Sequence, residues 1–167
     1  MEISAIPQSG LGTFQGTGGF LNPDKIVTEF GLKEGMNAAD FGCGAGYFTV
    51  LMAKLVGETG KITALDVQES PLDSVMVKAK LAGLENIQTV RSNLEVLGSS
   101  GLGNESQDMV LLANILFQSV KKELIIREAV RVLKNKWILI IIDWEKGGNG
   151  FGPPDNFRLD TENMKSL

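Results

Sequence analysis

Residues 39–47, Ala-Asp-Phe-Gly-Cys-Gly-Ala-Gly-Tyr, form the segment whose residue types and spacing most clearly predict chemistry. Glycine lacks a Cβ and tolerates unusual backbone dihedral angles, so Gly42, Gly44 and Gly46 would let the backbone approach a ligand closely. Asp66 ends a predicted strand about twenty residues further on, where an acidic side chain can accept hydrogen bonds from a ribose diol. A tight structural turn and a strand-end carboxylate or helix cap would explain each feature alone. Together the two features predict a nucleotide-binding site.

The charge beside the glycines indicates which nucleotide this site would bind. A dinucleotide-binding turn has the pattern G-x-G-x-x-G/A, whereas here the spacing is G-x-G-x-G and Tyr47 occupies the last small-residue position. The preceding Asp40 is placed poorly for a doubly charged pyrophosphate and well for a cationic ligand. S-adenosylmethionine carries an ammonium and a sulfonium, so the residues favour it over NAD. An NAD-dependent oxidoreductase is also disfavoured because no catalytic Tyr-Lys or histidine arrangement is evident.

The elements that must position these residues follow from the apolar pattern. Helical stripes alternate with short apolar runs, which is typical of right-handed βαβ crossovers with ligands at the carboxyl ends of parallel strands. We therefore predict an α/β fold, a doubly wound Rossmann-like parallel sheet of about five strands in the order 3-2-1-4-5, with helices on both faces. A further helix begins at Asn22-Pro23 and ends at Gly31. The five predicted strands cover residues 36–41, 62–67, 87–91, 109–113 and 137–143.

The segment Asp40 to Gly46 resembles motif I of the class I S-adenosylmethionine-dependent methyltransferases, and Leu65-Asp66-Val67 resembles motif II. Residues 112–117 are similar to motif IV, and residues 128–134 with the strand that ends at Asp143-Trp144 are similar to the segment before and through the family's fifth strand. Within this family, the sequence most resembles the branch of the ubiquinone and menaquinone biosynthesis C-methyltransferases. These proteins share a segment of the Phe20-Leu21-Asn22-Pro23 type at the start of the domain. The resemblance extends from about residue 20 to residue 155.

The resemblance implies a role for each matching position. Asp40 would lie near the methionine amino group, the glycines against the cofactor, and Asp66 on the ribose hydroxyls. Asn93 with Leu94 would lie at the adenine and Asn114 beside the methyl-transfer site, although both asparagines are equally plausible as turn residues. The predicted cofactor-binding residues are Asp40, Gly42, Cys43, Gly44, Gly46, Asp66, Val67, Asn93, Leu94 and Asn114.

The sequence departs from the family pattern at three places. Asn93 replaces the usual aspartate, so it lacks the charge that would accept from the adenine amino group, and we expect reduced cofactor affinity. The turn before the fifth strand is Lys134-Asn135-Lys136-Trp137 where relatives usually have Pro-Gly-Gly. The sixth and seventh strands of the family have no counterpart in the glycine- and proline-rich residues 144–167.

This pattern predicts three regions. Residues 1–20 would form a flexible arm, either a disordered terminus or a lid over the ligand; residues 21–145 the cofactor-binding domain; and residues 146–167 a tail with a short helical end from about Thr161. The fifth strand, residues 137–142, would then lie at a sheet edge with a strongly apolar surface. We expect a second copy to pack there, or the chain to be a truncated product; packing of the tail over the edge is the alternative.

The predicted function is methyl transfer from S-adenosylmethionine to a small-molecule acceptor by in-line displacement, in which alignment supplies much of the acceleration. Asp143 or Tyr47 could serve as a base, but Asp143 at a strand end is more often a hydrogen-bond anchor, and no catalytic residue is assigned. The alternative is a non-catalytic or truncated S-adenosylmethionine-binding module.

Composition sets the remaining expectations. The 167 residues suit one domain, and a net charge of -4 without a basic cluster disfavours nucleic acid as a partner. Cys43 is the only cysteine and there is no histidine, which excludes an internal disulfide and disfavours a metal site. No segment has the apolar length of a membrane span and no targeting signal is evident, so we expect a cytoplasmic protein.

Overall fold

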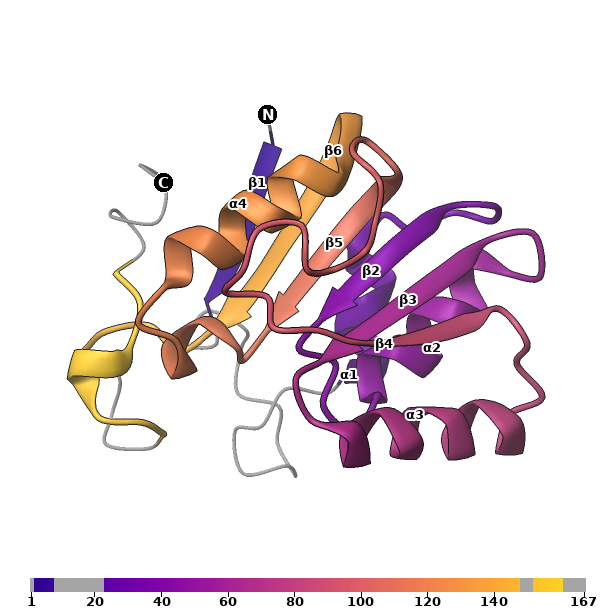
Figure 1. The fold of residues 1–167 in the computed structure, drawn as a ribbon, viewed down its shortest axis with the longest axis horizontal. Helices are drawn as coiled ribbons and strands as arrows, with labels where there is room; N and C mark the ends of the chain where they lie inside the picture. Colours follow the sequence, from indigo (N-terminus) through magenta and orange to yellow (C-terminus); the bar gives the residue numbers. More distant parts are fainter. Residues whose placement is uncertain (1, 8–22, 148–151, 161–167) are drawn as a thin grey trace.

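The computed structural model describes residues 2–7, 23–147 and 152–160, which form one α/β unit built on a six-stranded sheet (Figure 1). Every strand pairing in the sheet is parallel, and the strand order is β1-β6-β5-β2-β3-β4. In chain order the elements are β1 (Glu2–Pro7), α1 (Pro23–Ile26), η1 (Val27–Phe30), β2 (Asn37–Phe41), α2 (Tyr47–Val56), β3 (Lys61–Asp66), α3 (Glu69–Leu81), β4 (Ile87–Arg91), β5 (Gln107–Ala113), η2 (Leu116–Gln118), α4 (Lys122–Val132), β6 (Leu133–Asp143) and η3 (Asp155–Phe157).

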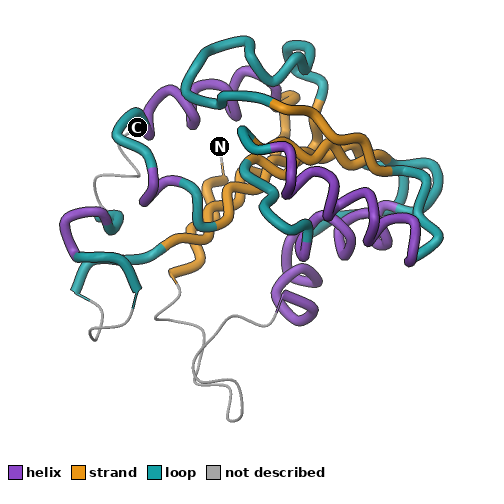
Figure 2. Tube along the Cα trace, turned by 60° about the horizontal axis from the view of Figure 1, so that its bottom comes forward, coloured by secondary structure: helices purple, strands orange, loops and turns teal. Residues whose placement is uncertain are grey.

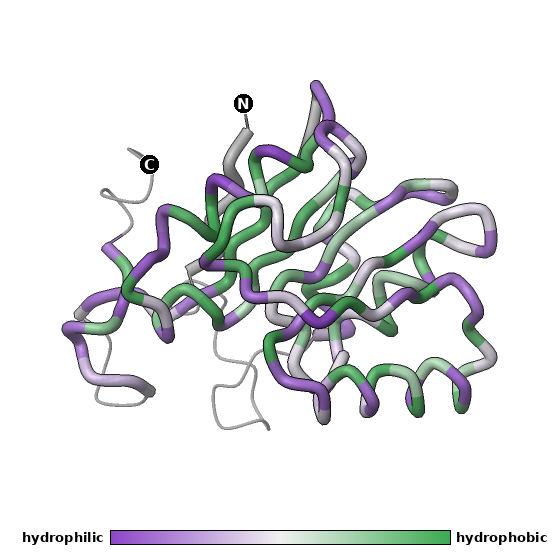
Figure 3. Tube along the Cα trace, viewed as in Figure 1, coloured by the Kyte–Doolittle hydropathy of each residue, from purple (hydrophilic) through white to green (hydrophobic). Residues whose placement is uncertain are grey.

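The sheet separates two apolar cores, because successive side chains of a strand point to opposite faces. In β6, Ile140 and Ile142 pack with residues of α1, α2 and α3, whereas Leu139 and Ile141 pack with residues of α4. Figure 2 shows α4 on one side of the strands and the other three α-helices on the opposite side. The strands are mostly hydrophobic, and hydrophilic residues recur along α3 (Figure 3). The predicted sheet with helices on both faces is confirmed.

The predicted strand order is also confirmed, since the five expected strands are β4, β3, β2, β5 and β6 in that spatial order. The expected sheet of about five strands has one more strand, formed by residues 2–7. This strand pairs in parallel with β6, from Glu2 opposite Ile138 to Pro7 opposite Asp143. Residues 2–7 are therefore part of the sheet and not of a flexible arm, and the rest of the predicted arm, residues 8–20, lies outside the described residues.

This pairing shows that the prediction of an exposed edge at the fifth strand, β6, is wrong. The backbone groups of β6 that would have been unpaired are bonded to β1 on one side and to β5 on the other. An apolar strand is stabilised when its edge is covered, and here the chain's own N-terminal segment supplies the cover. The argument for a second copy at this edge therefore no longer holds.

The start of β6 differs from the expected turn at residues 134–137. α4 ends at Val132 and β6 begins at Leu133 without a separate loop. The pairing with β5 changes register here: Gln107 lies opposite Leu133, whereas Met109 lies opposite Ile138. Residues 134–137 of β6 form the irregular stretch between these two pairs. After β6, a bridge joins Glu145 to Leu159, so residues 152–160 fold back beside residue 145. The predicted helical end from Thr161 lies outside the described residues.

Candidate functional site

A pocket of about 930 Å³ opens at the carboxyl ends of the strands, where doubly wound sheets bind their ligands. The turn after β2, the end of β3, the segment after β4 and the segment after β5 each contribute to its wall. Nine of the ten predicted cofactor-binding residues line it: Asp40, Gly42, Cys43, Gly44, Asp66, Val67, Asn93, Leu94 and Asn114.

Gly44 has the geometry expected of a glycine that faces a ligand. A Cβ at this position would meet no atom within 4 Å, so the backbone here borders open space. Its N–H donates to the Oδ2 of Asp66 at 3.1 Å, which ties the first turn to the end of β3 across 22 positions. The other carboxylate oxygen of Asp66 accepts from the N–H of Gln68 at 2.9 Å. Because an ionised carboxylate has about four acceptor sites, Asp66 keeps capacity for further donors such as hydroxyl groups.

The other two glycines of the turn make room for the protein's own side chains. A Cβ at Gly42 would lie 2.5 Å from the Cδ1 of Ile115, and one at Gly46 would lie 2.6 Å from the Cγ2 of Val75. Gly46 does not line the pocket, and its lack of a side chain lets α3 pack against the start of α2. The prediction that all three glycines clear space for a ligand therefore applies most directly to Gly44.

Asp40 lies in β2 at the floor of the pocket and is 1% exposed. The Thr49 hydroxyl donates to its Oδ2 at 2.6 Å. Burial raises the pKa of Asp40 to about 6, the charge of Asp66 adds to this effect, and the hydrogen bonds from Thr49 oppose it. Among the residues that the structure describes, no basic side chain forms an ion pair with Asp40. The site therefore holds a buried acid that a cationic ligand would stabilise in its ionised form.

Cys43 lines the pocket but is not suited to be a nucleophile. Burial raises the pKa of its thiol well above the ordinary value, and the charges of Asp40 and Asp66 raise it further. A thiol with a raised pKa stays protonated at neutral pH and reacts slowly.

The two asparagines both line the pocket and both occupy turn-like backbone positions. The Oδ1 of Asn93 accepts from the backbone N–H of Glu95 at 3.1 Å, so the side chain shapes a turn while it lines the pocket. The two N–H donors of the amide and the second lone pair of Oδ1 are what Asn93 offers to a ligand. Asn114 adopts a left-handed backbone conformation, with a φ of 56°, which asparagine tolerates better than most residues.

Asp143 serves as an anchor and not as a pocket base. Its Oδ2 accepts from the N–H groups of Leu116 and Phe117, at 2.9 and 3.2 Å, and its Oδ1 accepts from the N–H of Trp144 at 2.7 Å. Burial raises its pKa and these backbone hydrogen bonds lower it. The carboxylate thereby holds the segment after β5 in place, and its side chain is not part of the pocket wall.

The pocket continues past the predicted residues to an apolar wall that the sequence did not identify. Ile115 and Phe117 contribute from the segment after β5, and Trp144 contributes from the end of β6. A Cβ at Gly152 would lie 2.5 Å from the Trp144 ring, so the folded-back segment at residues 152–160 packs on this indole. These residues follow the carboxyl ends of two strands, and that position is the sequence signal that could have found them. The remaining lining residues that the prediction missed are Pro23, Ala45, Tyr47, Phe48, Gln68, Pro71, Ser92, Glu95, Ala113, Gln118, Ser119 and Ile125.

The comparisons with known proteins agree with this geometry. A family described as a methyltransferase domain matches residues 32–163, which is most of the chain. The chain belongs to the class I S-adenosylmethionine-dependent methyltransferases. The structure of an S-adenosylmethionine-dependent methyltransferase from Aquifex aeolicus is 32% identical, with a TM-score of 0.76 over 87% of this chain and 76% of that one. S-adenosylmethionine is the cofactor of this family, so the predicted family, fold and cofactor are confirmed.

Two further relatives, a curated protein and a solved structure, are similar to this chain over part of their length. A demethylmenaquinone methyltransferase from Staphylococcus aureus is 35% identical over 69 residues, 41% of this chain and 28% of that protein. This match confirms the resemblance to the menaquinone branch, and the chain spans less than a third of the length of that curated relative. An arsenic(III) S-adenosylmethionine methyltransferase from Chlamydomonas reinhardtii is 30% identical, with a TM-score of 0.57 over 62% of this chain and 36% of that one. The alternative of a non-catalytic module gains no support from these three matches.

In the part of the chain that the structure describes, no helix is both long and apolar enough to cross a membrane.

Proposed function

We propose that this chain binds S-adenosylmethionine along the glycine turn and transfers its methyl group to a small apolar or aromatic acceptor beside Phe117 and Trp144. The observation that carries the proposal is the single pocket that joins the two regions. Its volume of about 930 Å³ lies near the upper end of the range of roughly 300–1,000 Å³ for small-molecule sites. The pocket therefore has room for a nucleoside cofactor and a second small molecule.

The residues present fit this cofactor at three points. Asp40 is a buried carboxylate with a raised pKa, which an ammonium group would stabilise as an anion. Gly44 borders open space, so a ligand can approach the backbone. Asp66 retains acceptor capacity beside the turn, as a ribose diol requires.

When bound, S-adenosylmethionine supplies an electrophilic methyl group on a sulfonium. The task of the chain's own residues is to hold an acceptor in line with that group and to exclude water, since alignment can supply much of the rate. Ile115, Phe117 and Trp144 form an apolar wall for this purpose, and Asp143 fixes the backbone on both sides of it. The acceptor class also agrees with the Staphylococcus aureus relative, which is a demethylmenaquinone methyltransferase.

Calorimetry of the full chain with S-adenosylhomocysteine and with NADH tests the cofactor half of the proposal. We expect S-adenosylhomocysteine to bind and NADH not to bind. Asp66→Asn should weaken S-adenosylhomocysteine by about 10-fold through the loss of charged hydrogen bonds. Asp108→Asn is the matched control, because Asp108 also accepts a backbone N–H but lies at the opposite ends of the strands. Binding of NADH without binding of S-adenosylhomocysteine would reverse the assignment.

A transfer assay tests the acceptor half. The probe is S-adenosylmethionine with a radioactive methyl group, mixed with the reduced form of a short-chain demethylmenaquinone. We expect label to appear in the quinol, and Phe117→Ala to raise KM for the quinol while the affinity for S-adenosylhomocysteine stays within about 2-fold, because the wall contacts only the acceptor. Equal losses of quinol and cofactor binding in this variant would contradict the division of the pocket into two parts.

A further inference from the structure

A buried carboxylate on α4 holds the loop that carries Asn93 and Leu94, although it lies outside the pocket. Glu128 is 0% exposed, and both of its oxygens accept hydrogen bonds from the post-β4 loop, which we define as residues 92–106. Its Oε2 accepts from the N–H of Gly98 at 2.7 Å, and its Oε1 accepts from the N–H of Ser100 at 3.3 Å and from the Ser100 hydroxyl. One side chain thus fixes the middle of the loop from 28 to 30 positions away.

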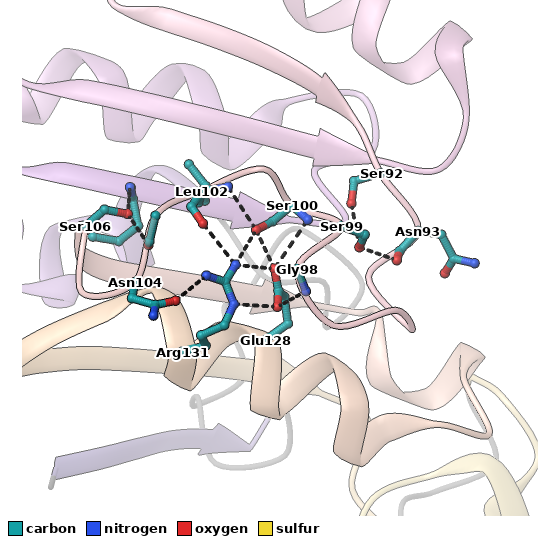
Figure 4. A network of polar contacts seen from close by, with 12 residues as sticks. Ser92, Asn93, Gly98, Ser99, Ser100, Leu102, Asn104, Ser106, Glu128 and Arg131 are labelled. Atoms are coloured by element: carbon teal, nitrogen blue, oxygen red, sulfur yellow. Dashed lines mark hydrogen bonds and ion pairs between the residues drawn. The ribbon is translucent and has the colours of Figure 1, made fainter.

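Arg131 extends the same contact toward the end of the loop (Figure 4). Its Nε and Nη2 donate to the two oxygens of Glu128 at 2.9 and 2.7 Å. Its Nη2 also donates to the carbonyl of Leu102 at 3.0 Å, and its Nη1 donates to the Oδ1 of Asn104 at 2.7 Å. The guanidinium therefore neutralises Glu128 and also binds loop atoms that Glu128 does not reach.

The held segment connects directly to the pocket wall. The Ser99 hydroxyl, between the two residues bonded to Glu128, donates to the backbone carbonyl of Asn93. The same hydroxyl lies 3.1 Å from the hydroxyl of Ser92, and both Ser92 and Asn93 line the pocket. Figure 4 shows these contacts as one path from α4 through residues 98–100 to Asn93.

The packing of α4 does not require this pair. Ile125, Ala129 and Val132 already bury an apolar face against the sheet. A buried ion pair is costly to desolvate, and well-packed apolar residues in its place are often as stable or more stable. What apolar residues could not do is accept the N–H groups of Gly98 and Ser100 and so fix the loop.

We infer that Glu128 is a positioning residue for the cofactor site: with Arg131 it holds the post-β4 loop in the conformation that receives the adenine end of the cofactor. The inference rests on the proposed function, with the ribose at Asp66 and, as the family resemblance implies, the adenine beside Asn93 and Leu94. It predicts that the pair determines how well the pocket distinguishes one base from another, in addition to any effect on stability.

The test compares Glu128→Gln with the Asp108→Asn control. Asp108 also accepts one hydrogen bond from a backbone N–H and one from a basic side chain, that of Lys134. Hydrogen exchange of the ligand-free proteins should show faster exchange at Gly98 and Ser100 in Glu128→Gln alone. Calorimetry should show S-adenosylhomocysteine binding about 10-fold more weakly to Glu128→Gln, as expected for a disturbed set of charged hydrogen bonds, and unchanged binding to the control.

The decisive measurement is the ratio of affinities for S-adenosylhomocysteine and S-inosylhomocysteine, which differ only in the base. Glu128→Gln should bring this ratio closer to one, and Asp108→Asn should leave it at the wild-type value. An unchanged ratio in a folded Glu128→Gln variant, or unchanged exchange at Gly98 and Ser100, would overturn the inference. Failure of the wild-type chain to bind S-adenosylhomocysteine would instead overturn the proposed function.

If Glu128→Gln does not fold, Ser100→Ala replaces it. That variant removes a hydroxyl that donates to Glu128 and accepts from the Nη2 of Arg131 and the N–H of Leu102, and it keeps the two members of the ion pair. Its effects should have the same direction and a smaller size, about 3-fold in affinity, because the hydroxyl's hydrogen bonds are lost while the charged pair is kept. A folded Ser100→Ala protein with wild-type base discrimination and wild-type exchange in residues 92–106 would count against the inference in the same way.

Discussion

Asp40 in β2 and Glu128 in α4 are both buried carboxylates, but the fold raises the pKa of Asp40 and lowers that of Glu128. Glu128 is paired inside the chain: although burial favours its neutral form, hydrogen bonds from Arg131, Ser100 and Gly98 hold its pKa at about 2. Asp40 is held by Thr49, and burial raises its pKa to about 6. Glu128 therefore has its charge partner within the fold, whereas under the proposed function the partner of Asp40 is the ammonium group of the cofactor.

Removing the partner of Glu128 should have the largest effect on stability. Arg131→Ala leaves a carboxylate buried without its charge partner, which typically costs about 3–5 kcal/mol. We expect the free energy of unfolding, measured by urea denaturation at pH 7, to fall by about this amount. A loss below about 1 kcal/mol would show that the pair is not the main support of the post-β4 loop.

Neutralising Asp40 should stabilise the ligand-free protein. A rise in pKa from 3.8 to about 6 corresponds to about 3 kcal/mol of strain in the ionised form at neutral pH. Asp40→Asn keeps the shape and an acceptor for Thr49, so the free energy of unfolding should increase by about 1–3 kcal/mol after imperfect replacement of the carboxylate is allowed for. The same variant should bind S-adenosylhomocysteine about 100-fold more weakly, because a charge-assisted hydrogen bond to the ammonium is lost. Reduced stability combined with unchanged binding would contradict the comparison.

The pH dependence of the two groups should differ in sign. The folded-state pKa of Asp40 is raised, so its contribution to stability is present at low pH and is lost as the pH rises toward about 6. The folded-state pKa of Glu128 is lowered from 4.5 to about 2, so its contribution is present above about pH 4.5 and is lost as the pH falls toward 2.

Of these two carboxylates, only Asp40 has a pKa between pH 5 and 8, so the pH dependence of cofactor affinity in this range reports on Asp40. Protonation of Asp40 removes the anion that an ammonium needs, so affinity for S-adenosylhomocysteine should fall below pH 6 by up to about 10-fold per pH unit. Calorimetry between pH 5 and 8 measures this slope, and Asp40→Asn should flatten it. A slope that persists in Asp40→Asn would assign the titration to another group.

The smallest expected effect is at Asn93. Asn93→Asp keeps an oxygen for the N–H of Glu95 and adds a second, charged oxygen in place of the amide nitrogen. Because the side chain is exposed, we expect S-adenosylhomocysteine to bind only about 3-fold more tightly, as for one modest hydrogen bond. Weaker binding to a folded Asn93→Asp protein would show that the amide nitrogen is the group the cofactor uses.

The turn after β2 shows how much local sequence could predict. The glycine spacing, Asp40 and Asp66 predicted that the ends of β2 and β3 meet at the ligand-binding edge of the sheet, because parallel strands bring their carboxyl ends to the same edge. Nine of the ten predicted residues line one pocket. Gly46 was predicted to face the ligand, but it faces Val75 of α3. The local sequence could not show this, because Val75 belongs to another helix.

The pairing of β1 with β6 could not be predicted in the same way. Residues 2–7 precede a glycine-rich stretch and show no pattern that identifies their neighbour, and their partner lies more than 130 positions away. The same holds for Glu128, since an acidic residue on a helix is usually solvated and only the position of the post-β4 loop makes it a buried acceptor.

The sequence by itself determined the fold class, the strand order and most of the predicted residues that line the pocket, because apolar periodicity and glycine spacing act within a few residues of one another. Only the tertiary structure decided which segment covers the edge of β6, which apolar wall completes the pocket, and which buried carboxylate is paired. These features join segments that are distant in the chain, so they depend on the relative placement of whole elements and not on any local pattern.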